Sequence, residues 1–88
     1  MKIKSGFIVR ELAGEYVVVA LGEASKIFNG IIKLNETGKF IWERLSLGED
    51  RETIIHAILK EYEADETQVE ADFDRFVETL KGANILES

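Results

Sequence analysis

The spacing of the apolar residues changes at Asn35, and this change constrains the fold more than any other feature of the chain. Before Asn35 the apolar residues come in short β-branched runs, which is the pattern of strands. After it they recur every three or four residues, which is the pattern of helices. We expect strands at residues 6–12, 15–22 and 30–34. The dipeptide Ala13-Gly14 between the first two runs predicts the turn of an antiparallel hairpin.

The link from the hairpin to the third strand carries weaker signals. We expect residues 23–28 (EASKIF) to form an irregular connection. The dipeptide Asn29-Gly30 predicts a second turn just before the third strand. That strand would then run directly into a helix, with only Asn35 between them.

Three helices are expected after Asn35, each preceded by a residue whose side chain can cap free N–H groups of the first turn. The expected helices cover residues 36–47, the segment after Asp50, and residues 65–81. Asn35, Asp50 and Asp65 are the expected caps, and Asp65 with Gln68 resembles a capping box.

These elements predict one α+β domain over residues 1–88, in which a three-stranded antiparallel sheet is followed by three helices. The arrangement is winged-helix-like, and the three helices alone could form a helix-turn-helix. Trp42 should be largely buried because its ring has the largest area to bury. The apolar pair Ile85-Leu86 should fold back onto the body of the domain.

The composition argues against an enzyme that works alone. A chain of 88 residues has a small core with little room for a deep cavity. It contains no cysteine and one histidine, His56, which we expect to face solvent. We therefore assign no catalytic residue, metal site or cofactor. No apolar run is long enough for a membrane span or a signal peptide, so we expect a cytoplasmic protein without a membrane partner.

The charge argues against nucleic acid as a partner. The net charge is −6, and residues 36–88 hold fourteen acidic and six basic residues, whereas residues 1–35 hold three acidic and five basic ones. The third helix, which would read DNA in a helix-turn-helix, carries six acidic and two basic residues over residues 65–81. Such a surface would repel the phosphate backbone.

The third strand, Gly30–Leu34, could dock another peptide if it lies at the edge of the sheet. An edge strand has free N–H and C=O groups that can pair with an added strand, and alternate side chains then set specificity. Ile32 and Leu34 would share one face of the strand, and Ile31 and Lys33 the other. The residues leave an alternative open, in which Ile31 packs on the sheet and Lys33 protects the edge from aggregation.

One segment resembles a known family. Leu34-Asn35-x-Thr37-Gly38-x-x-Ile41-Trp42 is similar to the LNxTGxxIW signature of the PqqD family. Further matches are Gly48, Ile55, Leu59 and Tyr62, followed by Asp72, Phe76, Val77, Leu80 and the Ile85-Leu86 tail. The resemblance covers nearly the whole chain.

The resemblance implies a winged-helix-like peptide chaperone, also called a precursor-peptide recognition element. Such proteins bind the leader of a ribosomally made precursor peptide and present it to a modifying enzyme, often a radical SAM enzyme, as in pyrroloquinoline quinone biosynthesis. In the family the leader adds as a strand to the third strand, in a groove completed by the third helix. Carried over, the peptide-binding residues would be Gly30, Ile31, Ile32, Lys33 and Leu34 on the strand and Val69, Asp72, Phe73, Phe76 and Leu80 on the helix. The alternatives are a winged-helix transcription regulator and a structural subunit of a larger complex.

Overall fold

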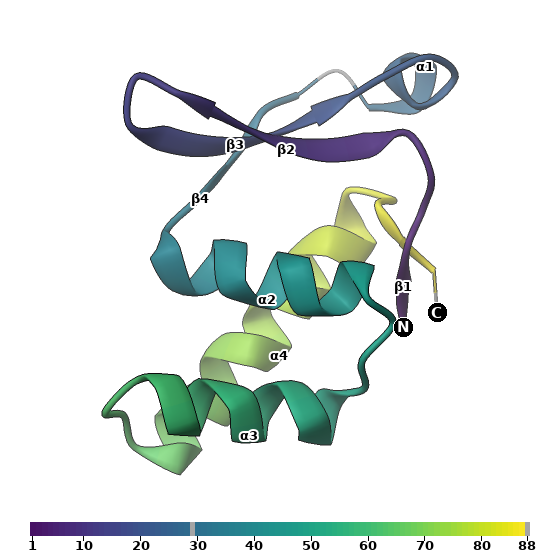
Figure 1. Ribbon diagram of the computed structural model, residues 1–88. Helices are drawn as coiled ribbons and strands as arrows, with labels where there is room; N and C mark the ends of the chain where they lie inside the picture. Colours follow the sequence, from purple (N-terminus) through teal and green to yellow (C-terminus); the bar gives the residue numbers. More distant parts are fainter. Residues whose placement is uncertain (29, 88) are drawn as a thin grey trace.

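The computed structural model describes residues 1–28 and 30–87. Within these ranges the elements are β1 (Lys2–Ile3), β2 (Phe7–Leu12), β3 (Glu15–Ala20), α1 (Ala24–Ile27), β4 (Ile32–Leu34), α2 (Glu36–Ser46), α3 (Arg51–Glu61), α4 (Glu66–Gly82) and β5 (Leu86–Glu87). The main sheet forms one layer, and the three longer helices lie together on one side of it (Figure 1). The predicted α+β class, with a three-stranded antiparallel sheet ahead of three helices, is confirmed.

The main sheet has the strand order β2-β3-β4, so β4 lies at one edge and β2 at the other. β2 and β3 form the expected hairpin. Its turn residues Ala13 and Gly14 have φ values of 53° and 81°. Two positive φ values in a row suit the right-handed twist of a hairpin, and Gly14 adopts its positive value at little cost because it lacks a Cβ atom. β4 pairs with β3 from Ile32 opposite Val18 to Leu34 opposite Tyr16.

Two expectations for the link between β3 and β4 are wrong. Residues 23–28 are not irregular throughout, because Ala24–Ile27 form the short helix α1. The third strand of the sheet begins at Ile32 instead of Gly30, because the chain reaches β3 only opposite Val18. Gly30 and Ile31 therefore precede β4. Asn29, the first residue of the expected Asn-Gly turn, lies outside the described residues.

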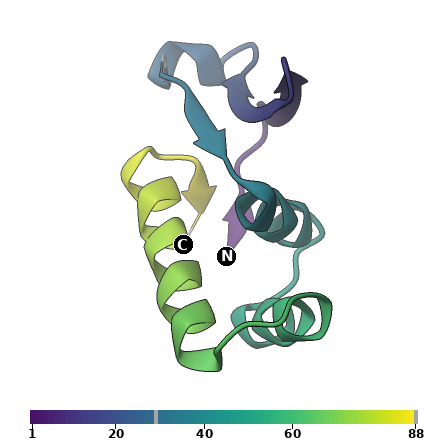
Figure 2. The ribbon, with the colours of Figure 1, turned by 90° about the vertical axis from the view of Figure 1, so that its left-hand side faces the viewer.

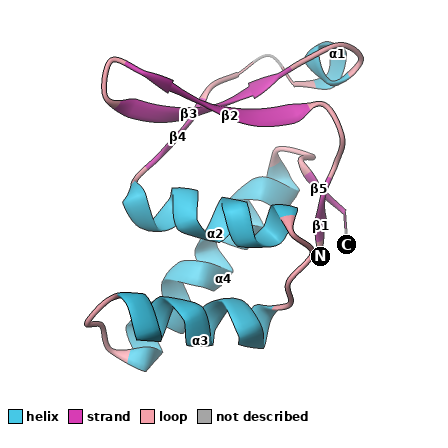
Figure 3. Cartoon of the chain, viewed as in Figure 1, coloured by secondary structure: helices cyan, strands magenta, loops and turns pink. Residues whose placement is uncertain are grey.

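The two ends of the described chain pair with each other, which the sequence did not predict. β1 and β5 form a separate two-stranded antiparallel sheet, drawn side by side in Figure 3. The Lys4 backbone N–H also donates a hydrogen bond to the Ile85 carbonyl at 2.8 Å. Ile85 and Leu86 are 0% and 5% exposed, which confirms that this apolar pair folds back onto the domain.

The three expected helix caps are confirmed. Side-chain oxygens of Asn35, Asp50 and Asp65 accept backbone N–H groups three residues later, at 2.7, 2.9 and 3.1 Å. The capping box at the start of α4 is only half formed. The Gln68 side chain donates to Asp72 at 2.9 Å, four residues ahead along the exposed helix, and not back to the cap.

The buried residues form one hydrophobic core with members from the main sheet and from all three long helices. Figure 2 shows the sheet and the helical layer from the side. Trp42 on α2 is 5% exposed, so its predicted burial is confirmed. Leu45 on α2, Ile54 on α3 and Leu80 on α4 are each 0% exposed at the centre of the helical layer. None of the described helices is long and apolar enough to cross a membrane.

Candidate peptide-binding site

The edge of β4 is open to solvent. In the described part of the chain β4 pairs with β3 alone. Successive residues of a strand direct their backbone N–H and C=O groups to opposite sides, so part of β4 turns these groups away from the sheet. Leu34 anchors the strand with 6% exposure, whereas the Lys33 side chain is 71% exposed. The strand is thus fixed at one end and has main-chain groups available along its free side.

A groove of about 380 Å³ runs beside β4 and is bounded by the start of α2 and by α4. In Figure 2, β4 runs down into α2 while α4 stands to the left of it. The groove is lined by Ile32, Lys33, Asn35, Thr37, Gly38, Ile41, Asp72, Arg75, Phe76 and Thr79. A neighbouring hollow shares Lys33 and Phe76 with the groove and adds Glu15 and Leu34. The concave surface therefore continues along the strand.

The structure brings half of the expected peptide-binding residues to this surface. Ile32, Lys33, Asp72 and Phe76 line the groove, and Leu34 lines the neighbouring hollow. The other five lie elsewhere. Val69, Phe73 and Leu80 are core residues with exposures of 6%, 1% and 0%, whereas Gly30 and the 71%-exposed Ile31 precede the strand.

Six residues that the sequence reasoning did not select also line the groove: Asn35, Thr37, Gly38, Ile41, Arg75 and Thr79. Two signals in the sequence point to them. Arg75 and Thr79 share a face of α4 with Asp72 and Phe76, because residues three or four apart on a helix are neighbours. The other four belong to the LNxTGxxIW segment that links β4 to α2.

A family model for Coenzyme PQQ synthesis protein D (PqqD) matches residues 15–86, which include both walls of the groove. The chain belongs to the PqqD family. No match was found among the curated proteins.

Two solved structures share the fold of this PqqD-family chain. TbiB1 in complex with the TbiA(beta) leader peptide is 30% identical in sequence, with a TM-score of 0.80, and the match covers 100% of this chain and 96% of that one. A lasso peptide synthetase B1 complexed with the leader peptide is 21% identical, with a TM-score of 0.77, and the match covers 99% and 96% of the two chains. The second likeness supports the fold only.

The PqqD signature explains how β4 joins α2 at the groove. Asn35 follows β4 directly, and its Oδ1 accepts the Gly38 backbone N–H at 2.7 Å. A Cβ atom on Gly38 would lie 3.2 Å from this oxygen and 3.6 Å from the Leu34 Cβ. The smaller distance is tighter than most side chains accept. Glycine therefore lets the first turn of α2 sit close against the end of β4.

The charged side chains of the groove form ion pairs that remain exposed to water. Lys33 Nζ lies 3.6 Å from the Glu15 carboxylate, and Arg75 lies 3.4 Å from Asp72. Exposed ion pairs contribute at most about 1 kcal/mol each. A bound peptide can therefore replace them with its own charges at low cost. The PqqD-family groove offers apolar surface from the half-buried Ile32 and Phe76, with both signs of charge around it.

A bidentate ion pair connects Arg51 of α3 with Asp74 of α4. The Arg51 guanidinium donates to both Asp74 carboxylate oxygens at 3.0 Å, and it lies 3.7 Å from Glu70. These hydrogen bonds lower the pKa of Asp74 below its ordinary value and raise the pKa of Arg51. Both groups are partly exposed, so we expect little stabilisation, but the paired geometry fixes the orientation of the helices.

The groups gathered here are suited to binding. The free edge of β4 supplies main-chain donors and acceptors, and α4 supplies an apolar ring and charges. His56 lies exposed on α3, away from the groove. Among the described residues no three His, Cys, Asp or Glu side chains are grouped so that they could hold a metal ion.

Proposed function

We propose that this protein binds the leader segment of a ribosomally synthesised precursor peptide and presents it to a modifying enzyme. The observation that carries the proposal is the free edge of β4 beside a groove with apolar and charged walls. The likeness to TbiB1, whose structure holds a leader peptide, adds support at 30% identity over nearly the full length of both chains.

In the proposed complex the leader adds as a strand to β4, and its side chains enter the groove. Each main-chain hydrogen bond is worth only about 1 kcal/mol net, and β4 is three residues long. Most of the affinity must therefore come from apolar contacts with Ile32 and Phe76, which line the groove and are only partly buried. Gly30 and the exposed Ile31 would extend the paired strand when the leader binds. Val69, Phe73 and Leu80 would act indirectly, by holding α4 in place.

The chemical step in this proposal belongs to a separate enzyme, for example a radical SAM enzyme, and the encounter takes place in the cytoplasm, where ribosomal precursors are made. A DNA-binding regulator is the main rival from another class. The charge of α4 argues against DNA binding, because the helix carries five acidic and two basic residues. A phosphate backbone would be repelled by such a helix.

The test is a fluorescence anisotropy titration of the protein with labelled leader peptides of ribosomally synthesised precursors, beginning with the TbiA(beta) leader of the TbiB1 complex, and with a mixed-sequence DNA duplex. We expect the leader to bind and the duplex not to bind at physiological salt. Salt-dependent binding of the duplex without leader binding would establish the regulator instead. Binding of neither ligand would favour a purely structural subunit.

Two phenylalanine variants locate the leader on the folded protein. Phe76→Ala removes an apolar wall of the groove, whereas Phe40→Ala removes a similarly half-buried ring that packs against Tyr62, away from the groove. We expect Phe76→Ala to weaken leader binding by about tenfold or more, as truncation of a buried aromatic contact does. Phe40→Ala should lower stability without changing the affinity of the folded protein.

A further inference from the structure

The sheet has a second free edge at β2, on the opposite side from β4. β2 is six residues long, twice the length of β4, and in the described part of the chain it pairs with β3 alone. Every second residue of such a strand turns its N–H and C=O groups away from its partner. β2 therefore has more unpaired main-chain groups to offer an added strand than β4 has.

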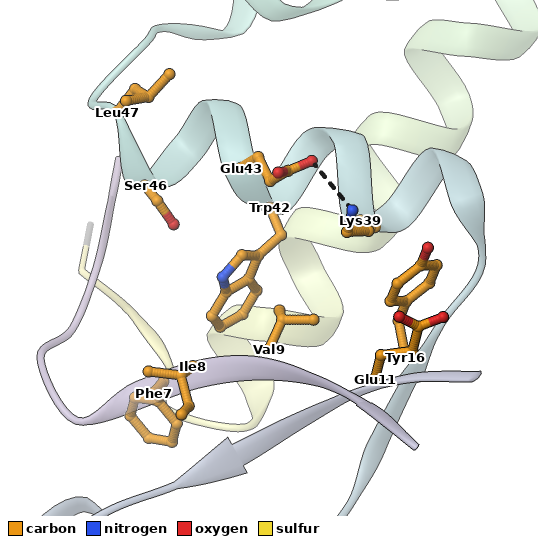
Figure 4. Close-up of a pocket in the computed structure, with 10 residues that line it drawn as sticks. All are labelled: Phe7, Ile8, Val9, Glu11, Tyr16, Lys39, Trp42, Glu43, Ser46 and Leu47. Atoms are coloured by element: carbon orange, nitrogen blue, oxygen red, sulfur yellow. Dashed lines mark ion pairs between the residues drawn. The ribbon is translucent and has the colours of Figure 1, made fainter. Parts of the chain in front are cut away.

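A groove of about 660 Å³ lies between this edge and α2. Figure 4 shows Val9 of β2 and Trp42 of α2 pointing toward each other across it, with Leu47 at one end. Leu47 in the groove is 75% exposed. Leu12, which ends β2 and lies outside the groove lining, is 56% exposed. An apolar surface of this kind beside an open strand edge marks a place where another chain can dock.

The charged side chains of this second groove favour a basic ligand. Lys39 Nζ lies 3.9 Å from the Glu43 carboxylate and 4.7 Å from the centre of the Tyr16 ring, so this lysine is already engaged within the groove. Glu11 forms no ion pair with any described residue. The lining thus contains two carboxylates, Glu11 and Glu43, and one lysine, Lys39, which already pairs with Glu43. The Glu11 carboxylate is available to a cation of the ligand.

We propose that β2 docks an extended segment of a second protein as an added strand beside α2, with its basic side chains turned toward Glu11 and Glu43 in the groove and its apolar side chains on the opposite face, where Leu12 is exposed. The inference does not depend on leader binding. Because β2 and β4 are opposite edges of the sheet, both can be occupied at once. A second copy of this chain fits less well, since a two-fold interface would bring the acidic groove of one copy against that of the other.

The test is an NMR titration of the ¹⁵N-labelled full chain with a synthetic peptide that alternates valine and lysine. The control peptide alternates valine and glutamate. We expect the lysine peptide to shift the amide signals of Phe7–Leu12 and the indole signal of Trp42, the only tryptophan in the chain. The signals of Ile32–Leu34 should not move, and the glutamate peptide should bind at least several-fold more weakly.

A charge-reversal pair tests the assignment of the acidic residues. Glu11→Lys combined with Glu43→Lys should weaken binding of the lysine peptide by about tenfold, because each substitution turns an exposed attraction between opposite charges into a repulsion. Glu52→Lys combined with Glu63→Lys changes the net charge equally at exposed positions outside the groove and should leave binding unchanged.

Four results would overturn the proposal. The first is that the lysine peptide shifts the signals of Ile32–Leu34 instead of those of β2, and the second is that the glutamate peptide binds equally well. The third is that no binding occurs at roughly millimolar peptide, the weak end of specific affinity. The fourth is that the signals of Phe7–Leu12 shift with protein concentration alone, which would identify a second copy as the occupant of this edge.

Discussion

Proline placed at Ile32 or at Lys33 tests which side of β4 receives the leader peptide. The two positions are adjacent in the strand, so their backbone N–H groups face opposite sides. One proline removes a donor that faces β3, and the other removes a donor that faces the groove. Proline has no N–H and is tolerated at an edge only where that donor faces solvent.

The expected effects of the two prolines differ in kind. Loss of the groove-facing donor removes one hydrogen bond and leaves a leader carbonyl without its partner, at a cost of about 1 to 3 kcal/mol. Each 1.4 kcal/mol of binding free energy changes the dissociation constant tenfold, so the Kd of the leader should rise by roughly ten- to a hundredfold. Loss of the donor that faces β3 should instead lower the free energy of unfolding by a similar amount.

The assay combines leader titration by anisotropy with urea unfolding, and circular dichroism confirms that each variant is folded. Ile32→Ala and Lys33→Ala are the matched controls, because they shorten the same side chains and keep the N–H groups. The contrast between proline and alanine at one position isolates the main-chain bond. If both folded proline variants bind the leader as tightly as the unaltered protein, the docking edge lies elsewhere.

Three further predictions concern stability and charge. Trp42→Ala should lower the free energy of unfolding by about 3 to 5 kcal/mol because the ring is 5% exposed, and a negligible shift in the urea midpoint would contradict this. Lys33→Glu should slow the association of an acidic leader only modestly, as stopped-flow measurements at two salt concentrations would reveal. Asp74 has a lowered pKa, so its pairing with Arg51 stabilises the fold above the unfolded pKa of about 3.9. That contribution is lost as the pH falls through the lower, folded-state pKa, and Asp74→Asn should make acid unfolding less steep.

The long elements could be predicted from the sequence, whereas the short ones could not. A periodic pattern over many residues identified the hairpin and the three long helices, and a single polar side chain marked the start of each helix. α1 has four residues, and β1 and β5 have two each. Their formation depends on contacts with segments far away in the sequence, such as the pairing of β1 with β5. The spacing of apolar residues within a short segment does not predict such a contact.

The candidate site was predicted in part for a related reason. The resemblance to the PqqD family placed Val69, Phe73 and Leu80 at the groove, but these residues belong to the apolar stripe of α4 and lie in the core. The groove is lined by the neighbouring face of α4, where charged residues alternate with Phe76. Periodicity predicts which face is covered, but the width of the surface left open beside it depends on how close β4 comes to α4.

The uneven charge of the chain bears directly on the leader that this groove would accept. Lys33 comes from the first 35 residues, where basic residues are in excess, and Asp72 comes from the acidic remainder of the chain. The groove joins these two regions and pairs each charge with a neighbour, Glu15 on one side and Arg75 on the other. A uniformly acidic leader would gain attraction at Lys33 and lose it at Asp72. The pattern of charges along the leader, more than its net charge, should therefore decide which precursor is bound.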